Sequence, residues 1–193
     1  VFQAYLQQQT ARIVNYVRGI DQAGYELSGT SPAFTIPAFR NRRVDYDGDG
    51  TVETWRLGDV IHSTPTVVGR PAESYDLLYR DESYSTFYNQ FKNRRNMVYV
   101  GANDGMFHAF NGGFYDNGDK AFLTQPLDDN RDPITTYTDF DLGMEMWSYV
   151  PHNLLPHLHW LTQEQEYGHV YYCDLKPKVF DAKVLPEDRK SVV

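Results

Sequence analysis

The sequence predicts a mainly β protein made of partial β-propeller-like blades with an N-terminal helix. Aromatic residues make up 15% of the chain, including 15 Tyr and 11 Phe, and aromatic residues favour strands. Residues 96–111 alternate on both sides of an Asn-Asp-Gly turn, which is typical of a β-hairpin. Short strands and turns then recur along the chain, as they do in the blades of a propeller.

Residues 2–18 form the expected N-terminal helix. Its apolar residues recur near helical spacing and are Phe2, Leu6, Ile13 and Val17. Gly19 is expected to end this helix. Residues 19–44 are rich in Gly, Ser, Thr and Pro and read as a linker. We therefore divide the chain into a helix and linker, residues 1–44, and an acidic loop followed by incomplete propeller blades, residues 45–193.

The second part carries a series of short expected elements. They are a proline-interrupted strand region at 58–69, a short helix within 70–95, the hairpin at 96–111, a surface insertion loop at 112–140, a strand at 145–151, a short helix at 153–161, two paired strands at 169–173 and 178–184, and a polar tail at 186–193. These elements make two or three blades, whereas a complete propeller has at least four. The chain could therefore not close into a ring by itself. Because it begins at Val1 within the expected helix and without an initiator Met, we expect a fragment, a processed protein or a trimmed chain.

The composition argues against a nucleic-acid partner and against a membrane-spanning helix. The formal net charge is −8, and no basic run is present to neutralise phosphates, so a nucleic-acid partner is disfavoured. No apolar stretch approaches the roughly 20 residues that a membrane-spanning helix needs. The single cysteine, Cys173, cannot form a disulfide within the chain.

Residues 45–53 predict a calcium site. Carboxylates stand at positions 1, 3, 5 and 9 of this stretch, and a glycine stands at position 6, where calcium loops turn sharply. Calcium prefers six to eight oxygen ligands, and a backbone carbonyl at position 7 is typical of such loops. The predicted ligands are Asp45, Asp47, Asp49, the Thr51 carbonyl and Glu53.

A plain hairpin turn is the alternative interpretation of this loop, because Asp-Gly is a strong turn dipeptide. A turn does not need four acids in register, however, and stacked carboxylates repel one another without a cation. Position 12 of the EF-hand pattern is Arg56, so the loop would close at position 9. Magnesium is disfavoured because it resists dehydration. Arg40, Arg42 and Arg43 precede the loop and are expected to neutralise neighbouring acids.

Other combinations of polar residues predict no further site. His157 and His159 are two residues apart and would diverge on a helix, so we expect no zinc site. His62 and His108 are expected to be packed or hydrogen-bonded within strands. Ser63 lies near His62 and Asp59, but the chain lacks the G-x-S-x-G motif of a nucleophile elbow.

Five separate segments, taken together in order, resemble the C-terminal domain of the PilY/PilC family of type IV pilus proteins. They are residues 15–19, 39–42, 57–65, 98–110, and 147–151 with 153–155. The resemblance covers roughly residues 11–175. It implies a modified β-propeller in a large secreted protein that promotes pilus assembly, opposes retraction and serves as an adhesin.

The same resemblance implies partners, a location and a metal. Expected partners are minor pilins or other pilus-tip proteins, the remainder of the propeller on another chain, and a host or abiotic surface. The implied location is extracellular, at the pilus tip or bacterial cell surface, reached through the periplasm. Family members carry a calcium loop of alternating aspartates tied to extension and retraction, and the Asp45–Glu53 stretch resembles it.

Two alternatives stay open. Residues 98–110 also resemble the repeat of quinoprotein dehydrogenases, which are propellers that use calcium with a quinone cofactor. In those enzymes the calcium ligands come from separate blades, whereas here the acids are contiguous, so we expect no catalytic activity. The other alternative is a structural propeller subunit in which calcium only stiffens a blade junction.

Overall fold

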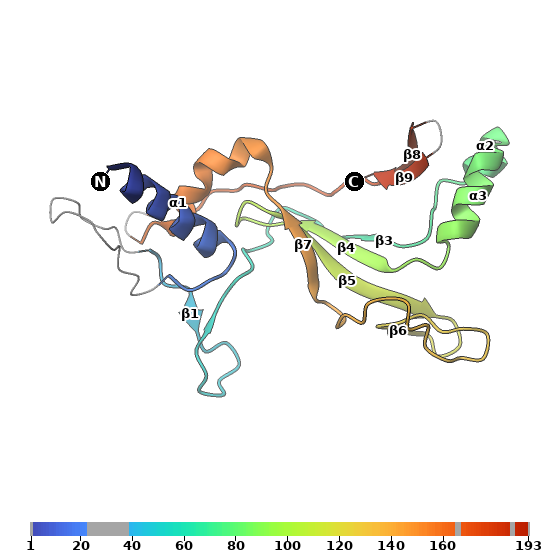
Figure 1. Ribbon diagram of the computed structural model, residues 1–193, viewed down its shortest axis with the longest axis horizontal. Helices are drawn as coiled ribbons and strands as arrows, with labels where there is room; N and C mark the ends of the chain where they lie inside the picture. Colours follow the sequence, from blue (N-terminus) through green and yellow to red (C-terminus); the bar gives the residue numbers. More distant parts are fainter. Residues whose placement is uncertain (1, 23–38, 165–166, 186–187, 193) are drawn as a thin grey trace. The chain divides into compact units, whose positions relative to one another are not determined.

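The computed structural model describes residues 2–22, 39–164, 167–185 and 188–192. Contacts divide the chain into two compact units, which we describe separately (Figure 1). Unit 1 comprises Val1–Ile61, Ala102–Met106 and Val150–Cys173, and unit 2 comprises His62–Gly101, Phe107–Tyr149 and Asp174–Val193. The boundary after residue 44 that the sequence suggested stays a prediction.

Unit 1 is organised around helix α1, Phe2–Val17, and the 3-10 helix η1, His152–Thr162. Its buried core consists of Tyr16, Val17, Met106, Leu158 and Leu161. The predicted N-terminal helix is confirmed, but Leu6 is 46% exposed, so the predicted apolar stripe is wrong at this position. The core therefore lies at the C-terminal end of α1.

The end of α1 has the hydrogen bonds of a Schellman motif. Gly19 has a φ of +80°, its amide donates to the Tyr16 carbonyl at 2.9 Å, and the Ile20 amide donates to the Asn15 carbonyl at 2.9 Å. Glycine is favoured there because side chains rarely adopt that backbone conformation. The predicted end of the helix is thus confirmed.

Unit 2 contains an antiparallel sheet with strand order β3-β4-β5-β6, in which β7 also pairs with β5 (Figure 1). The strands are β3, Thr66–Val68; β4, Asn96–Gly101; β5, Phe107–Asp116; β6, Ala121–Leu123; and β7, Glu145–Tyr149. The predicted hairpin is confirmed, because β4 and β5 pair in register from Val98 opposite Phe110 to Gly101 opposite Phe107. The mainly β class with an N-terminal helix is likewise confirmed, without a closed sheet among the described residues.

The two faces of this sheet differ. On one face the rings of Tyr99 and Phe107 stack at 5.8 Å, and Trp147 lies 5.7 Å from Tyr99. These aromatic residues follow the alternation that places every second side chain of a strand on the same face. On the opposite face Val100 and His108 are buried.

Asn111 holds the long connection between β5 and β7 against the sheet. Its side-chain amide donates to the carbonyls of Phe140 and Asp141 at 2.8 and 2.9 Å. Its side-chain oxygen accepts hydrogen bonds from Arg95 and from the Gly113 amide, both at 2.9 Å. Asn111 is only 2% exposed, so one buried side chain makes all four of these hydrogen bonds.

Two helices and a hairpin complete unit 2. Helix α2, Tyr75–Tyr79, precedes helix α3, Glu82–Phe91, so the single helix expected within 70–95 is two. Strand β8, Phe180–Leu185, pairs with β9, Asp188–Val192. The Tyr84 hydroxyl on α3 donates to Asp181 on β8 at 2.7 Å. Burial, followed by this hydrogen bond, raises the pKa of Tyr84 to about 12.

Several expected boundaries are wrong. The predicted insertion loop at 112–140 begins with the end of β5 and contains β6. Of the strand region at 58–69 only β3 is a named strand. The expected strand at 169–173 does not form, because its residues serve other contacts: the Tyr172 amide donates to the Asn103 side chain at 3.4 Å. Strand β8 therefore pairs with the tail, which forms β9.

Within the described residues, none of the helices combines the length and the apolar character needed to cross a lipid bilayer.

Replacing Asn111 with alanine should lower the free energy of unfolding by at least about 1–3 kcal/mol, because it leaves buried polar groups without partners. Urea denaturation of the whole chain, monitored by tryptophan fluorescence, would measure the change. Asn153→Ala, at an exposed position of η1, is the control and should change the unfolding midpoint little. Equal midpoints for the two variants would contradict the role given to Asn111.

Candidate metal site

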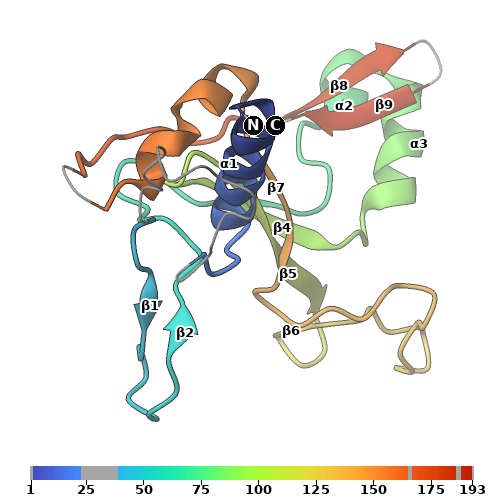
Figure 2. The same cartoon turned by 60° about the vertical axis from the view of Figure 1, so that its left-hand side comes forward.

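The acidic loop connects the two strands of a short hairpin in unit 1. Strand β1, Arg43–Val44, pairs with β2, Glu53–Thr54, with Arg43 opposite Thr54 and Val44 opposite Glu53. Figure 2 shows the two strands side by side, with the loop at the far end of the hairpin. Gly48 and Gly50 have φ values of +77° and +87°, which let the chain curl back on itself between the aspartates.

Three of the five predicted ligands converge. Asp45, Asp47 and Asp49 each offer a carboxylate oxygen, and these oxygens lie within 4.8 Å of one another. Two ligands bound to one calcium at about 2.4 Å can be at most about 4.8 Å apart, so the spacing fits a shared ion. All three residues are exposed, which leaves the group open to solvent for ion entry.

Hydrogen bonds within the loop hold the aspartates in place. The two carboxylate oxygens of Asp45 accept from the Gly48 and Gly50 amides at 2.7 and 3.0 Å. Asp49 accepts from the Thr51 amide at 2.6 Å. These bonds use backbone donors only, so each carboxylate keeps lone pairs that can face a cation.

The other two predicted ligands lie at the edge of this group. Glu53 is not one of the three converging carboxylates; its carboxylate hydrogen-bonds with the Tyr46 hydroxyl, which is the main cause of a raised Tyr46 pKa. The Thr51 amide is already turned toward Asp49. That the Thr51 carbonyl and Glu53 bind the metal stays a prediction.

The three arginines before the loop contact the helix end and Asp21. Arg40 Nε donates to the Tyr16 hydroxyl at 3.2 Å. Arg42 donates to the Tyr16 carbonyl and lies 3.8 Å above the Tyr16 ring, while Arg43 pairs with Asp21 at 3.6 Å. The expected neutralisation of neighbouring acids therefore holds for Arg43 and Asp21. Arg40 contacts the Tyr16 side chain, whereas Arg42 joins the base of the hairpin to the negative end of the α1 dipole.

The histidines occupy varied surroundings. His108 is 2% exposed and its Nδ1 lies 2.6 Å from Glu145, so the expectation of a packed, hydrogen-bonded His108 is confirmed. His62 is exposed and lies outside the strands, so its expected position packed within a strand is wrong. The His157 ring lies 4.6 Å from Trp160, and His159 Nδ1 lies 2.8 Å from the Pro156 carbonyl.

The Ser63 hydroxyl is engaged by the backbone. It donates to the Leu175 carbonyl at 3.0 Å and accepts from the Gly101 amide at 2.9 Å. A nucleophilic serine instead needs a base that can take its proton. The chemistry available to Ser63 here is structural, because its proton is held by a carbonyl.

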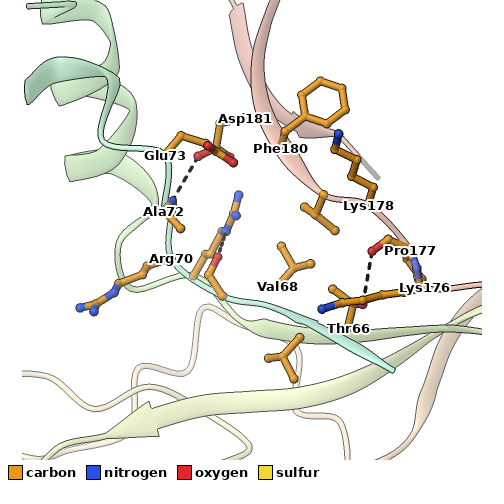
Figure 3. A pocket seen from close by; sticks show the side chains of 14 residues that line it. Thr66, Val68, Arg70, Ala72, Glu73, Lys176, Pro177, Lys178, Phe180 and Asp181 are labelled. Carbon is orange, nitrogen blue, oxygen red and sulfur yellow. Dashed lines mark hydrogen bonds between the residues drawn. The ribbon is translucent and has the colours of Figure 1, made fainter. Parts of the chain in front are cut away.

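Sequence reasoning missed a groove in unit 2, lined by both β3 and residues 176–181 (Figure 3). The segment Lys176-Pro177-Lys178 was the one local signal, since it combines two cations with a residue that ends strand pairing. The sequence could not show that this segment lies beside β3, because the two walls are far apart along the chain.

Comparison with known proteins gives a consistent result. Residues 57–144 match the family model described as the PilY1 beta-propeller domain. A type IV pilus biogenesis factor PilY1 homolog of Xylella fastidiosa (strain Temecula1 / ATCC 700964) is 31% identical over 180 residues, which cover 89% of this chain and 9% of the relative. The type IV pilus biogenesis factor PilY1 of Pseudomonas aeruginosa (strain PAK) is 34% identical over 131 residues, which cover 65% of this chain and 9% of that relative.

The chain thus spans about a tenth of the length of these curated relatives. The acidic loop at 45–53 lies just before the region that the family domain matches. No solved structure matches the chain significantly.

Cys173 is half-buried in unit 1, and burial, assisted by the charge of Asp104, raises its pKa to about 11. A raised pKa lowers the thiolate fraction at pH 8, and the thiolate is the reactive form. We expect Ellman's reagent to react about 100-fold more slowly with the folded chain than with the chain unfolded in urea. The reason is that the Cys173 pKa differs by about two units between the two states. Equal rates would contradict this environment for Cys173.

Proposed function

This chain belongs to the PilY1 family, and we propose that it is part of a calcium-binding type IV pilus biogenesis factor that acts by holding other proteins rather than by catalysis. The observation that carries the calcium part of the proposal is the convergence of Asp45, Asp47 and Asp49 within the span of one ion. The pilus part is supported by the curated relatives, which are named as type IV pilus biogenesis factors.

Calcium would act on the hairpin as a mechanical clamp. The two strands of the hairpin pair through only two residues each, and an isolated two-stranded hairpin is marginally stable. An ion bound by the three aspartates would relieve their mutual repulsion and fix the far end of the hairpin. The Thr51 carbonyl and Glu53 would complete the shell, with Glu53 leaving its hydrogen bond to Tyr46.

The base of the hairpin contacts helix α1, so calcium binding at the loop would also restrict how the hairpin moves against the helix. Arg42 contacts the Tyr16 carbonyl and ring, and Tyr16 is a buried member of the unit 1 core. Loosening of the loop without calcium would therefore change the mobility of the β1–β2 hairpin while the core stays packed. The affected surface would be the loop and the exposed rings of Tyr46 and Trp55, whose centroids lie 6.0 Å apart.

The setting follows from the family. We propose that the complete protein acts outside the cell or at its surface, with minor pilins or other pilus-tip proteins as partners and surface adhesion as a further role. Remaining blades of the propeller would come from sequence outside the region described here, because one blade-like sheet cannot close a ring.

Isothermal titration calorimetry of the whole chain with calcium, and with magnesium for comparison, tests whether the loop binds calcium. We expect binding at micromolar or tighter affinity and at least about tenfold weaker binding in Asp47→Asn, because one charged ligand is lost. Asp129→Asn removes an exposed acid elsewhere and should leave the affinity unchanged. Equal affinity in both variants, or no calcium binding at all, would overturn the calcium site.

The pilus role is tested in a bacterium that makes the full-length protein. Asp47→Asn should change the number of surface pili or the twitching rate relative to wild type, because calcium loss frees the hairpin, whereas Asp129→Asn should not. Immunoblots must show equal amounts of the protein. If the wild type binds calcium in vitro while Asp47→Asn leaves pili and twitching unchanged, a regulatory role for this loop is rejected.

A further inference from the structure

A groove of about 480 Å³ runs along the β3 edge of the sheet in unit 2. One wall is β3 with Gly69 and Arg70, and the other is the segment Lys176–Asp181 that leads into β8. In Figure 3 Lys176 and Lys178 lie on the opposite side of Val68 from Arg70. The volume lies in the range of ligand sites, about 300–1,000 Å³.

The groove opens where the backbone pairing between these two segments ends, just before Pro177. Ser63 and Leu175 form a parallel bridge, and the Leu175 amide donates to the His62 carbonyl at 3.1 Å. The contact continues to Thr66, whose hydroxyl donates to the Pro177 carbonyl at 3.3 Å. Pro177 has no amide hydrogen to donate, and beyond it the chain leaves β3 and enters β8.

In the part of the chain that the structure describes, no second strand therefore lies along the edge of β3 next to the groove. Among the described residues β3 lies at the end of the strand order and pairs with β4 alone. Val67 is 64% exposed. An edge of this kind offers backbone donors and acceptors to an incoming strand, which is the basis of recognition by strand addition.

The charge of the groove is opposite to that of the chain. Its lining contains the cations of Arg70, Arg94, Lys176 and Lys178, against the carboxylates of Glu73 and Asp181. The chain as a whole carries a formal net charge of −8. A cationic groove on an acidic protein favours anionic partners and steers them to one place.

The two carboxylates are held at one end of the groove. Asp181 is 5% exposed, and its Oδ2 accepts from the Tyr84 hydroxyl at 2.7 Å and from the Ala72 amide at 3.3 Å. In Figure 3 Glu73 and Asp181 lie together, away from Lys176. Lys176 and Lys178 form no ion pair with another described residue.

We propose that this groove binds an extended acidic segment of a partner protein, which adds to the free edge of β3 as a further strand. Alternate side chains of a strand point to opposite faces. Apolar side chains of the segment would contact Val68 and Phe180, and its carboxylates would lie beside Lys176 and Lys178. The preferred segment thus alternates acidic and apolar residues. This inference deepens the proposed function and rests on its premise that the chain acts by binding proteins.

The test uses the whole chain and a fluorescein-labelled peptide of alternating Glu and Val, six residues long, in a fluorescence anisotropy titration. We expect saturable binding that weakens as sodium chloride is raised, and no binding of the matching Lys-Val peptide. The double variant Lys176→Glu/Lys178→Glu should bind at least about tenfold more weakly, since it reverses both contacting charges. Lys92→Glu/Lys120→Glu changes the net charge equally at exposed positions and should bind as the wild type does.

A second peptide separates strand addition from simple attraction of charge. N-methylation of alternate amides keeps the side chains and removes backbone donors, so it should abolish binding if the peptide pairs with β3. Undiminished binding of the methylated peptide, or equal binding by both lysine double variants, would overturn the proposal. Heparin or an oligonucleotide that binds the groove more tightly than the peptide would overturn it in favour of a general polyanion site. Titration in EDTA removes calcium, so failure here is distinct from failure of the metal loop.

Discussion

Backbone pairing along β5 is the constraint on which unit 2 depends. The first part of this strand pairs with β4 on one side and β7 on the other, and its last residues pair with β6. Because β5 has a neighbour along its whole length, its register fixes the register of the sheet. Asn111 lies within this strand and ties the connection that leads to β7 back to the sheet. The long excursion between β5 and β7 is therefore compatible with regular pairing at both its ends.

Local features of the sequence account for what could be predicted. The α1 helix with Gly19 and the β4–β5 hairpin depend on residues close together in the chain, and the alternating aspartates of residues 45–49 depend on spacing alone. The strand β9 was missed because residues 188–192 show no apolar alternation and form a strand only by pairing with β8. The groove was missed because Thr66 and Pro177, which meet at its end, are 111 residues apart. Long-range contacts of this kind leave no periodic signal.

The two candidate surfaces differ in how they are built and in what they can bind. The aspartate loop is short, acidic and exposed, and its geometry is set by hydrogen bonds to its own backbone. The groove is cationic and is built from one strand edge and a distant segment. A loop of the first kind binds a small hard cation, whereas a groove of the second kind has the length and polarity to hold a peptide. A member of the PilY1 family could thus use separate parts of one region for metal and for protein.

The segment around Pro177 comes late in the chain, and this affects the order in which the protein folds during its synthesis. A chain leaves the ribosome from its N-terminus, so β3 and β4 emerge before residues 174–181 exist to cover the upstream edge. Closing a loop of 111 residues is slow compared with forming the local β4–β5 hairpin. During that interval the whole edge from Ser63 to Val68 is open to mispairing with another nascent chain. A chaperone that shields unpaired strands would be of most use to this protein in that window of its biosynthesis.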